Sequence, residues 1–534
     1  MLNRRQILRA AAAGIYLSAL QGRPAFAQKR GGTLVLAFQT DIPVFNNIAD
    51  SQFGAHMVSS NLFNMLVSLD TDLKLQPDLA ESWAFSDGGR TVTFRLRKGV
   101  VFHDGAPLTS ADVKFTIEKA MPHHPRAKAF FLPLVEAVET PDELTAVLRL
   151  KQPFAPLLSF LGVPTGGCMI LPKHVFEPYV GTRDAFLKAP PTISKPVGSG
   201  PFMFQEYVRG SHLSLVRNPK YWNAPKPYAD RLVIRFISDE NSRMVALERG
   251  EVDFINSNII PWDQVPRLRK DPRFKVLDVG EEGTAQLEYL VINGFRPTTG
   301  NPKVRQALAF AIDRTQIAAL AAAGIANVAN GIVHSKTRWA YSPVYEQYKP
   351  NLARARALLD EAGFPMKGAS RFSLSMSYAT GIAPEAAAAE IIKQQLKAVG
   401  IDVILSSYDR ASAMGRVYID RNYDLFLQAG VSGPDPTMAV APLYDANNRV
   451  PGVFTNTGNY ENPRVQELLA VEGKEQDVAK RGELWKEIGR IIAQDVPLLP
   501  LYELPWVHTQ SARWANVVTR AIGSVQNRED AYLV

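Results

Sequence analysis

The sequence contains only one cysteine, Cys168, which excludes an intramolecular disulfide. Cys168 lies in the apolar run 168–171, where it is predicted to pack as a small core residue. The G-x-S-x-G and H-E-x-x-H motifs of hydrolases are also missing, and no Cys and His residues are spaced as a metal-ligand set. His103 is next to Asp104 but lacks a third positioned group, so it is predicted to be structural. The sequence thus predicts no catalytic residue, no metal and no cofactor.

Long hydrophobic runs are scarce as well. The apolar stretch at about 10–20 is shorter than the roughly 20 residues that cross a bilayer. It follows Arg4 and Arg5 and precedes the small-x-small sequence at 25–27, a pattern typical of an export signal cleaved after about Ala27. The arginine pair resembles a twin-arginine signal, and an ordinary secretory signal stays open as the alternative. Both routes predict a periplasmic protein.

The sequence also lacks a strong imbalance between positive and negative charge. The chain carries 60 Lys and Arg against 52 Asp and Glu, a formal net charge of +8, and four of these arginines lie within residues 1–27. The mature chain therefore has a net charge of +4. Acidic residues interrupt the basic ones throughout, which argues against nucleic acid as a partner. The remaining chain is long enough for about three domain-sized units.

The most informative stretch that is present runs from 195 to 254. It opens with the turn Gly198-Ser199-Gly200-Pro201, which neither a helix nor a central strand would accommodate. The pattern after it predicts a hairpin of strands 202–207 and 211–216, a strand at 231–237, and a helix from about 241 to 249 capped by Ser238. Physical reasoning alone predicts a compact α/β scaffold here.

Hydrophobic periodicity predicts further elements along the chain. Strands are expected at 31–38, 91–96, 145–150, 286–295, 372–378, 401–405 and 424–428. Helices are expected at 57–69, from about 111, at 301–314, at 351–364 and at 384–399. The alternation of strands and helices after residue 300 predicts a second lobe built on a mixed sheet.

The order of the blocks PVGSGPF, VRNPKYW, PYADRLVIRFI and ALERGEVDF resembles the family 5 solute-binding proteins of ABC importers, the peptide/nickel class. The resemblance covers nearly all of 31–505. It implies an α/β, two-lobed periplasmic-binding-protein fold (type II, cluster C), with mixed sheets in both lobes and an extra subdomain in the first. The expected division is a signal peptide at 1–27, lobe I at 28–290 with the subdomain at about 71–190, lobe II at 291–496, and a return to lobe I over 497–534.

The resemblance also implies a function. Members capture a solute between two lobes and deliver it to a membrane permease, so a monomeric receptor for a short peptide or peptide-like molecule is expected, not an enzyme. In peptide-binding relatives an aspartate before the Asp-Pro pair anchors the peptide amino group. Ser432 or Gly433 stands in its place here, so a metal chelate, an oligosaccharide or an opine-like metabolite stays open as cargo. An exported hydrolase is the alternative from another class, and the missing motifs argue against it.

Loop position and the resemblance together identify candidate site residues. The expected ligand-binding residues are Asp41, Phe45 and Asn46 in the first loop, Tyr378 and Thr380 at a strand end, and Gly430, Val431, Ser432 and Gly433 after the strand 424–428. Backbone N–H groups in this last loop, with Ser432, could hold a carboxylate; an ordinary turn is the alternative. The expected hinge residues are Asn293 and Pro500.

Overall fold

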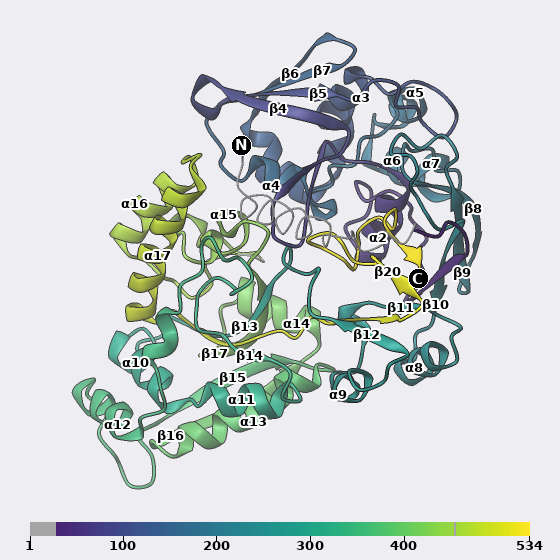
Figure 1. Cartoon of the computed structure of the whole chain (residues 1–534). Helices are drawn as coiled ribbons and strands as arrows, with labels where there is room; N and C mark the ends of the chain where they lie inside the picture. The colour runs from purple at the N-terminus through teal and green to yellow at the C-terminus, as the bar shows by residue number, and fades with distance from the viewer. Residues whose placement is uncertain (1–27, 453–454) are drawn as a thin grey trace, which may run out of the picture.

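The computed structural model describes residues 28–452 and 455–534, so the predicted export signal at 1–27 lies outside the described residues. The described strands form one seven-stranded, one six-stranded and one four-stranded sheet, together with two sheets of two strands (Figure 1). Helices pack around these sheets, and the fold is α/β with mixed sheets, as predicted.

The seven-stranded sheet is the core of the first lobe. Its strand order is β12 (Phe274–Leu277), β19 (His508–Ser511), β11 (Phe254–Ile255), β1 (Thr33–Phe38), β10 (Arg231–Phe236), β9 (His212–Arg217) and β8 (Phe202–Val208). β1 runs parallel to β10 and β11, and the other pairs are antiparallel. The predicted hairpin is confirmed as β8–β9. Helix α8 (Glu240–Glu248) follows β10, but its cap is Asp239, which accepts a hydrogen bond from Ser242 N, and not Ser238.

The glycine turn before β8 packs against the end of helix α2 (Phe53–Leu62). A Cβ atom on Gly198 would lie 1.9 Å from the carbonyl oxygen of Leu62, and Gly200 N donates to that oxygen at 2.9 Å. Gly198 N in turn donates to Nδ1 of His103 at 3.2 Å. Burial lowers the pKa of His103 to about 4, and the neutral ring serves as a structural acceptor.

The predicted helix at 57–69 is wrong in its second half. α2 ends at Leu62, and the chain then forms β2 (Val67–Leu69), which pairs with β3 (Leu75–Pro77). The buried Asp78 accounts for the break, because its carboxylate accepts hydrogen bonds from Met65 N and from the Asn64 side chain at 3.0 and 2.9 Å. These bonds hold the backbone out of the helix.

The four-stranded sheet is antiparallel and lies at the top of Figure 1. Its order is β4 (Ala80–Ser86), β5 (Thr91–Leu96), β7 (Thr145–Leu150) and β6 (Val135–Asp142). Helix α3 (Ser110–Phe115) packs on this sheet and begins at a capping box of Thr109 and Asp112, close to the predicted start.

The six-stranded sheet is the core of the second lobe. Its order is β14 (Asn327–Val328), β18 (Leu498–Glu503), β13 (Gln286–Ile292), β17 (Leu425–Val431), β15 (Phe372–Ala379) and β16 (Ile401–Tyr408). β15 is parallel to β16 and β17, whereas β13 is antiparallel to both of its neighbours. The predicted strand end at 428 is wrong, because Gly430 and Val431 continue β17 and pair with Leu287 and Gln286.

The remaining helices of the first lobe are all short, whereas those of the second include longer ones such as α13 and α17. Those of the first lobe are α4 (Leu157–Leu161), α5 (Lys173–Phe176), α6 (Arg183–Lys188), α7 (Pro190–Ile193) and α9 (Val265–Leu268). Those of the second are α10 (Pro302–Ala311), α11 (Arg314–Ala321), α12 (Leu352–Glu361), α13 (Ala383–Lys397), α14 (Arg410–Met414), α15 (Pro436–Ala439), α16 (Pro463–Glu472) and α17 (Val478–Asp495). A helix with the length and apolar character of a membrane span is absent from the described residues.

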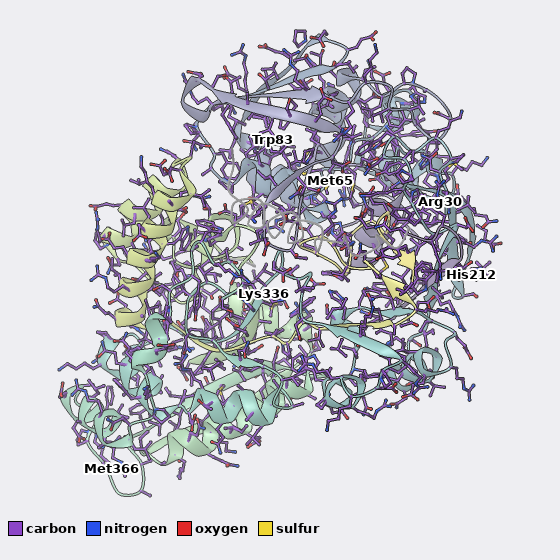
Figure 2. All side chains as sticks on the ribbon, viewed as in Figure 1. Arg30, Met65, Trp83, His212, Lys336 and Met366 are labelled. Atoms are coloured by element: carbon purple, nitrogen blue, oxygen red, sulfur yellow. The ribbon has the colours of Figure 1, made fainter. Side chains whose placement is uncertain are left out.

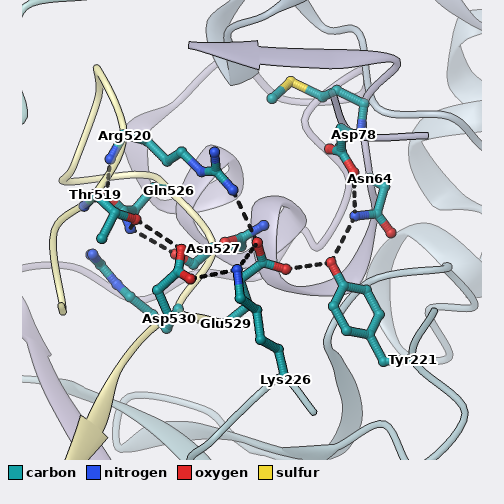
Figure 3. A network of polar contacts seen from close by, with 12 residues as sticks. Asn64, Asp78, Tyr221, Lys226, Thr519, Arg520, Gln526, Asn527, Glu529 and Asp530 are labelled. Carbon is teal, nitrogen blue, oxygen red and sulfur yellow. Dashed lines mark hydrogen bonds and ion pairs between the residues drawn. The ribbon is translucent and has the colours of Figure 1, made fainter. Parts of the chain in front are cut away.

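The C-terminal tail is tied to the first lobe by a buried polar network (Figure 3). Glu529 accepts hydrogen bonds from Tyr221 Oη at 2.6 Å and Arg520 Nη2 at 2.9 Å, and its Oε1 lies 3.6 Å from Lys226 Nζ. Two short strands, β20 (Trp514–Ala515) and β21 (Tyr532–Leu533), pair within the tail.

The chain passes between the two large sheets twice. It leaves β12 of the seven-stranded sheet and enters β13 of the six-stranded sheet through residues 278–285, and it returns from β18 to β19 through 504–507. Lys336 of the second lobe, at the centre of Figure 2, contacts the first of these connections: its Nζ donates to Asp278 O at 2.7 Å and to Glu282 Oε1 at 3.1 Å. The residue limits expected for the lobes and the subdomain stay predictions.

Candidate ligand-binding site

A cavity of about 900 Å³ lies where the two sheets meet. The first lobe contributes lining residues from the start of α8 and from the segment after β11. The second contributes the start of β13, the middle of β17, the ends of β15 and β18 and the start of α13. The connection 504–507 closes one side with Leu504, Pro505 and Trp506. The volume of the cavity is within the range found for small-molecule binding sites.

Strand register places a carboxylate in the wall of this cavity. Glu288 on β13 pairs with Ala429 on β17 and with Tyr502 on β18, and all three residues line the cavity. Glu385, in the first turn of α13, is a second carboxylate in the lining. It accepts a hydrogen bond from Ala379 N, at the end of β15, at 3.1 Å.

Both carboxyl groups are buried, and this decides their protonation. Glu288 is 2 % exposed and Glu385 is 5 % exposed. Burial, and then the charge of Glu385, raises the pKa of Glu288 well above its ordinary range. Burial raises the pKa of Glu385 to about 7, against the opposing effects of the Ala379 N–H and of Arg410. Both shifts favour the protonated form, so the pair holds a proton more strongly than ordinary glutamates do.

Aromatic side chains form further parts of the wall. Trp262 enters from the first lobe and packs against the hydrophobic core of the second. Trp506 enters from the connection 504–507, and its ring centroid lies 6.4 Å from that of Phe53 at the start of α2. Tyr502 completes the aromatic surface on β18. Such surfaces bury the apolar parts of a solute and stack on its planar groups.

The first-loop residues predicted for the site pack within the first lobe. Asp41 accepts hydrogen bonds from Tyr207 Oη at 2.7 Å and Gly210 N at 3.1 Å. Phe45 is fully buried, with its ring centroid 5.5 Å from that of Tyr207. Asn46 is also fully buried, and its Oδ1 accepts from the backbone N–H of residue 48.

The other predicted ligand residues lie next to the lining. Tyr378 and Thr380 alternate along the chain with Ala379 and Gly381, and the cavity lining contains the latter pair. On β17 the lining contains Ala429, whereas the four predicted residues follow it. Gly430 packs against the Tyr289 ring, and Gly430 and Val431 border a separate pocket of about 20 Å³.

Ser432 and Gly433 are held by the connection 278–285. Ser432 is fully buried; its N donates to Ala285 O at 3.0 Å, and its Oγ accepts from His334 N at 3.2 Å. Gly433 lies against the carbonyl group of Glu282. The roles of all nine residues in ligand binding stay predictions.

The two predicted hinge residues lie inside the second lobe. Asn293 follows the last residue of β13, and its side chain donates to Tyr423 O at 2.7 Å and Arg421 O at 3.1 Å. Pro500 sits within β18, opposite Tyr289. Their role in bending also stays a prediction.

Sequence reasoning missed Glu288, Glu385, Trp262 and Trp506. Glu288 carried a usable signal, because it is a charged residue inside the apolar strand sequence LEYLVI. The other three have no local pattern that distinguishes them from ordinary helix and loop residues.

Two lobes that enclose one cavity, with walls from both and two connections between them, define a solute-binding protein of the periplasmic type. The family model "Bacterial extracellular solute-binding proteins, family 5 Middle" matches residues 74–451, and the chain belongs to this family.

Relatives agree with this assignment over most of the chain. The glutathione-binding protein GsiB of Escherichia coli K12 is 29 % identical over 490 residues, which cover 91 % of each chain. The crystal structure of the ABC transporter substrate-binding protein CtaP from Listeria monocytogenes has a TM-score of 0.80 at 25 % identity, covering 95 % of this chain and 100 % of CtaP. The structure of AgaA from A. tumefaciens R10 with agropinic acid has a TM-score of 0.74 at 25 % identity, covering 94 % and 99 %.

Proposed function

We propose that the protein captures a short peptide or peptide-like solute in the cavity between its lobes and delivers it to the permease of an ABC importer. The observation that carries the proposal is the cavity of about 900 Å³, whose wall combines carboxylates and aromatic rings from both lobes. Its size suits a molecule of a few residues. GsiB is named for glutathione, a peptide, and AgaA was crystallised with agropinic acid, so an opine-like cargo is the second candidate.

The proposed mechanism is binding followed by closure, without a chemical step. We place the bending in the connections 278–285 and 504–507, because these segments join the two sheets. Closure would bring Trp262 of the first lobe and Glu288 of the second onto opposite sides of the solute. The closed, monomeric form would then present both lobes to the permease.

Location in the periplasm is part of the same proposal. Residues 1–27 have the pattern of an export signal, and the paired Arg4 and Arg5 favour the twin-arginine route. Cleavage after about Ala27 would release the mature chain, which has a single cysteine and so needs no disulfide in that compartment.

Native mass spectrometry of protein purified from periplasm tests the proposal. We expect a mass above that of the mature chain, and denaturation should release an intact small solute. Ala429→Trp, which fills the cavity from β17, should be purified without solute and should melt at the temperature of solute-free wild-type protein. Wild-type protein that is always empty, and that no peptide or opine stabilises against heat, would contradict the receptor role.

A further inference from the structure

The wall of the cavity contains a carboxylate oxygen without a partner. Oε1 of Glu288 is buried and has no hydrogen-bond partner among the described residues, and the side chain lines the cavity. A buried carboxyl group in this condition destabilises the protein unless something neutralises it or bonds to it. Oε1 is itself closed off from solvent, and the described residues give the Glu288 carboxyl group no hydrogen bond at either oxygen, although the residue lines the space where the proposed solute would lie.

The lining as a whole is acidic in a chain that is otherwise basic. Four of the described lining residues are acidic, namely Glu240, Asp263, Glu288 and Glu385, and Arg410 is the one basic residue among them. Arg410 lowers the pKa of Glu385, but the ion pairs found in the described residues include none between Arg410 and either glutamate. The cavity thus has more acidic than basic groups, and a bound cation would favour the charged form of the two buried glutamates.

We propose that Glu288 and Glu385 bind a protonated amine or guanidinium group of the solute, so that the cargo is a cationic, peptide-like molecule. This inference rests on the proposed function and specifies its solute class. An organic cation would donate hydrogen bonds to the carboxylates of the pair and take the place of the proton that the pair otherwise holds. A metal ion fits less well, because no group of three or more His, Cys, Asp or Glu residues is placed to hold one among the described residues.

The aromatic residues of the same wall favour such a group. Tyr502 stands beside Glu288 in the sheet, and Trp262 and Trp506 line the same cavity. Aromatic faces attract ammonium and guanidinium groups and also bury the attached carbon chain. A cationic group would gain both a charge-assisted hydrogen bond to Glu288 and the attraction of these rings, whereas a neutral group would gain only an ordinary hydrogen bond.

Binding of this kind is linked to pH. The groups that face the pair are Tyr502 on β18, Arg410 on α14, and Glu240 and Asp263 across the cavity. Because a cation binds the deprotonated pair, its association releases a proton. The affinity for a guanidinium solute, which stays charged, should therefore rise as the pH increases from 5.5 to 8, whereas the affinity for a neutral analogue should change little.

Matched ligand pairs test the inference on the mature protein. The probes are dipeptides and tripeptides, each with its N-acetyl form, and Gly-Arg with its citrulline analogue; binding is measured by thermal shift and titration calorimetry at pH 7.5. We expect at least one cationic probe to bind ten times or more tightly than its neutral twin. Glu288→Gln and Glu385→Gln should each reduce this preference to less than threefold. Both are nearly isosteric, and the control is Asp402→Asn, a half-buried position at the far end of β16 that is not part of the cavity lining.

The outcomes separate this inference from the receptor role. The cation site would be refuted if a neutral analogue binds as tightly as its cationic probe, or if Glu288→Gln still prefers the cationic probe. Either result would leave the proposed receptor function unaffected. Failure of every probe would overturn the cationic peptide-like class; the solute released from periplasmic protein would then decide the receptor role on its own. A released solute without a basic group would also refute the inference.

Discussion

Arg481 and Asp435 form a bidentate ion pair inside the second lobe, with Nη1–Oδ2 and Nη2–Oδ1 distances of 2.8 and 2.7 Å. The Asp435 carboxylate also caps α15 by accepting from Thr437 N, and Arg481 Nη2 reaches Glu472 at 3.2 Å. This pair fixes the loop that follows β17, next to the connection between the lobes. Asp435 thus has a structural role that its place before Pro436 does not itself reveal.

Asp435→Ala should lower the free energy of unfolding by about 3–5 kcal/mol, because it leaves Arg481 buried without its main partner. Urea denaturation of wild type and of Asp435→Ala measures the difference in unfolding free energy. The control is Asp184→Ala, which breaks an exposed ion pair with Lys188 and should cost less than about 0.5 kcal/mol. Equal losses in the two variants would show that the buried pair is not what stabilises the loop.

Gly198→Ala should destabilise the first lobe by about 3 kcal/mol, because the added Cβ would overlap the carbonyl oxygen of Leu62 at 1.9 Å. Thermal unfolding is the measurement. Gly181→Ala serves as the matched control, since an added Cβ there meets no atom within 4 Å and should change stability by less than about 0.5 kcal/mol. Tolerance of Gly198→Ala would contradict the close approach of the turn to α2.

Glu529→Gln should lower the pKa of Asp78. Burial, and then the charge of Glu529, raises the pKa of Asp78 to about 7. Removing that charge leaves burial alone to oppose ionisation, so the pKa must fall. Carbon NMR of the side-chain carboxyl groups follows the titration directly, with the exposed Glu467→Gln as a control that should leave Asp78 unchanged. If the pKa of Asp78 is the same in Glu529→Gln as in wild type, the charge of Glu529 does not affect the ionisation of Asp78.

Glu385 should make the empty protein less stable as the pH rises. The folded state holds the proton up to a pKa of about 7, whereas the unfolded chain releases it near 4.5. Folded protein therefore binds more protons between these values, and stability falls with rising pH across that window, by up to about 3 kcal/mol from Glu385 alone. Unfolding of wild type and Glu385→Gln by urea from pH 4 to 8 measures this. If the difference in unfolding free energy between wild type and Glu385→Gln does not change with pH, the pKa of Glu385 is not raised in the folded protein.

Local sequence patterns predicted much of the fold and little of the site. The hairpin β8–β9 and the cap of α3 follow from turn and capping residues that act within a few positions. The end of α2 depends instead on Asp78, sixteen residues further along the chain. A contact at that separation cannot be predicted from the local hydrophobic pattern of a helix. Glu288 and Trp262 come together only when two lobes meet, so their shared cavity is a property of the tertiary structure.

Ligand binding should change the tryptophan fluorescence of the protein, because Trp262 and Trp506 line the cavity and Trp262 packs across the junction of the lobes. The probe is the solute released from periplasmic protein, added back to unfolded and refolded, solute-free protein. Trp262→Phe with Trp506→Phe should remove most of the change. Trp83→Phe, on β4 in the four-stranded sheet at the top of Figure 2, should retain it. If the double variant responds as fully as wild type while Trp83→Phe loses the signal, the solute binds away from this cavity, near the four-stranded sheet.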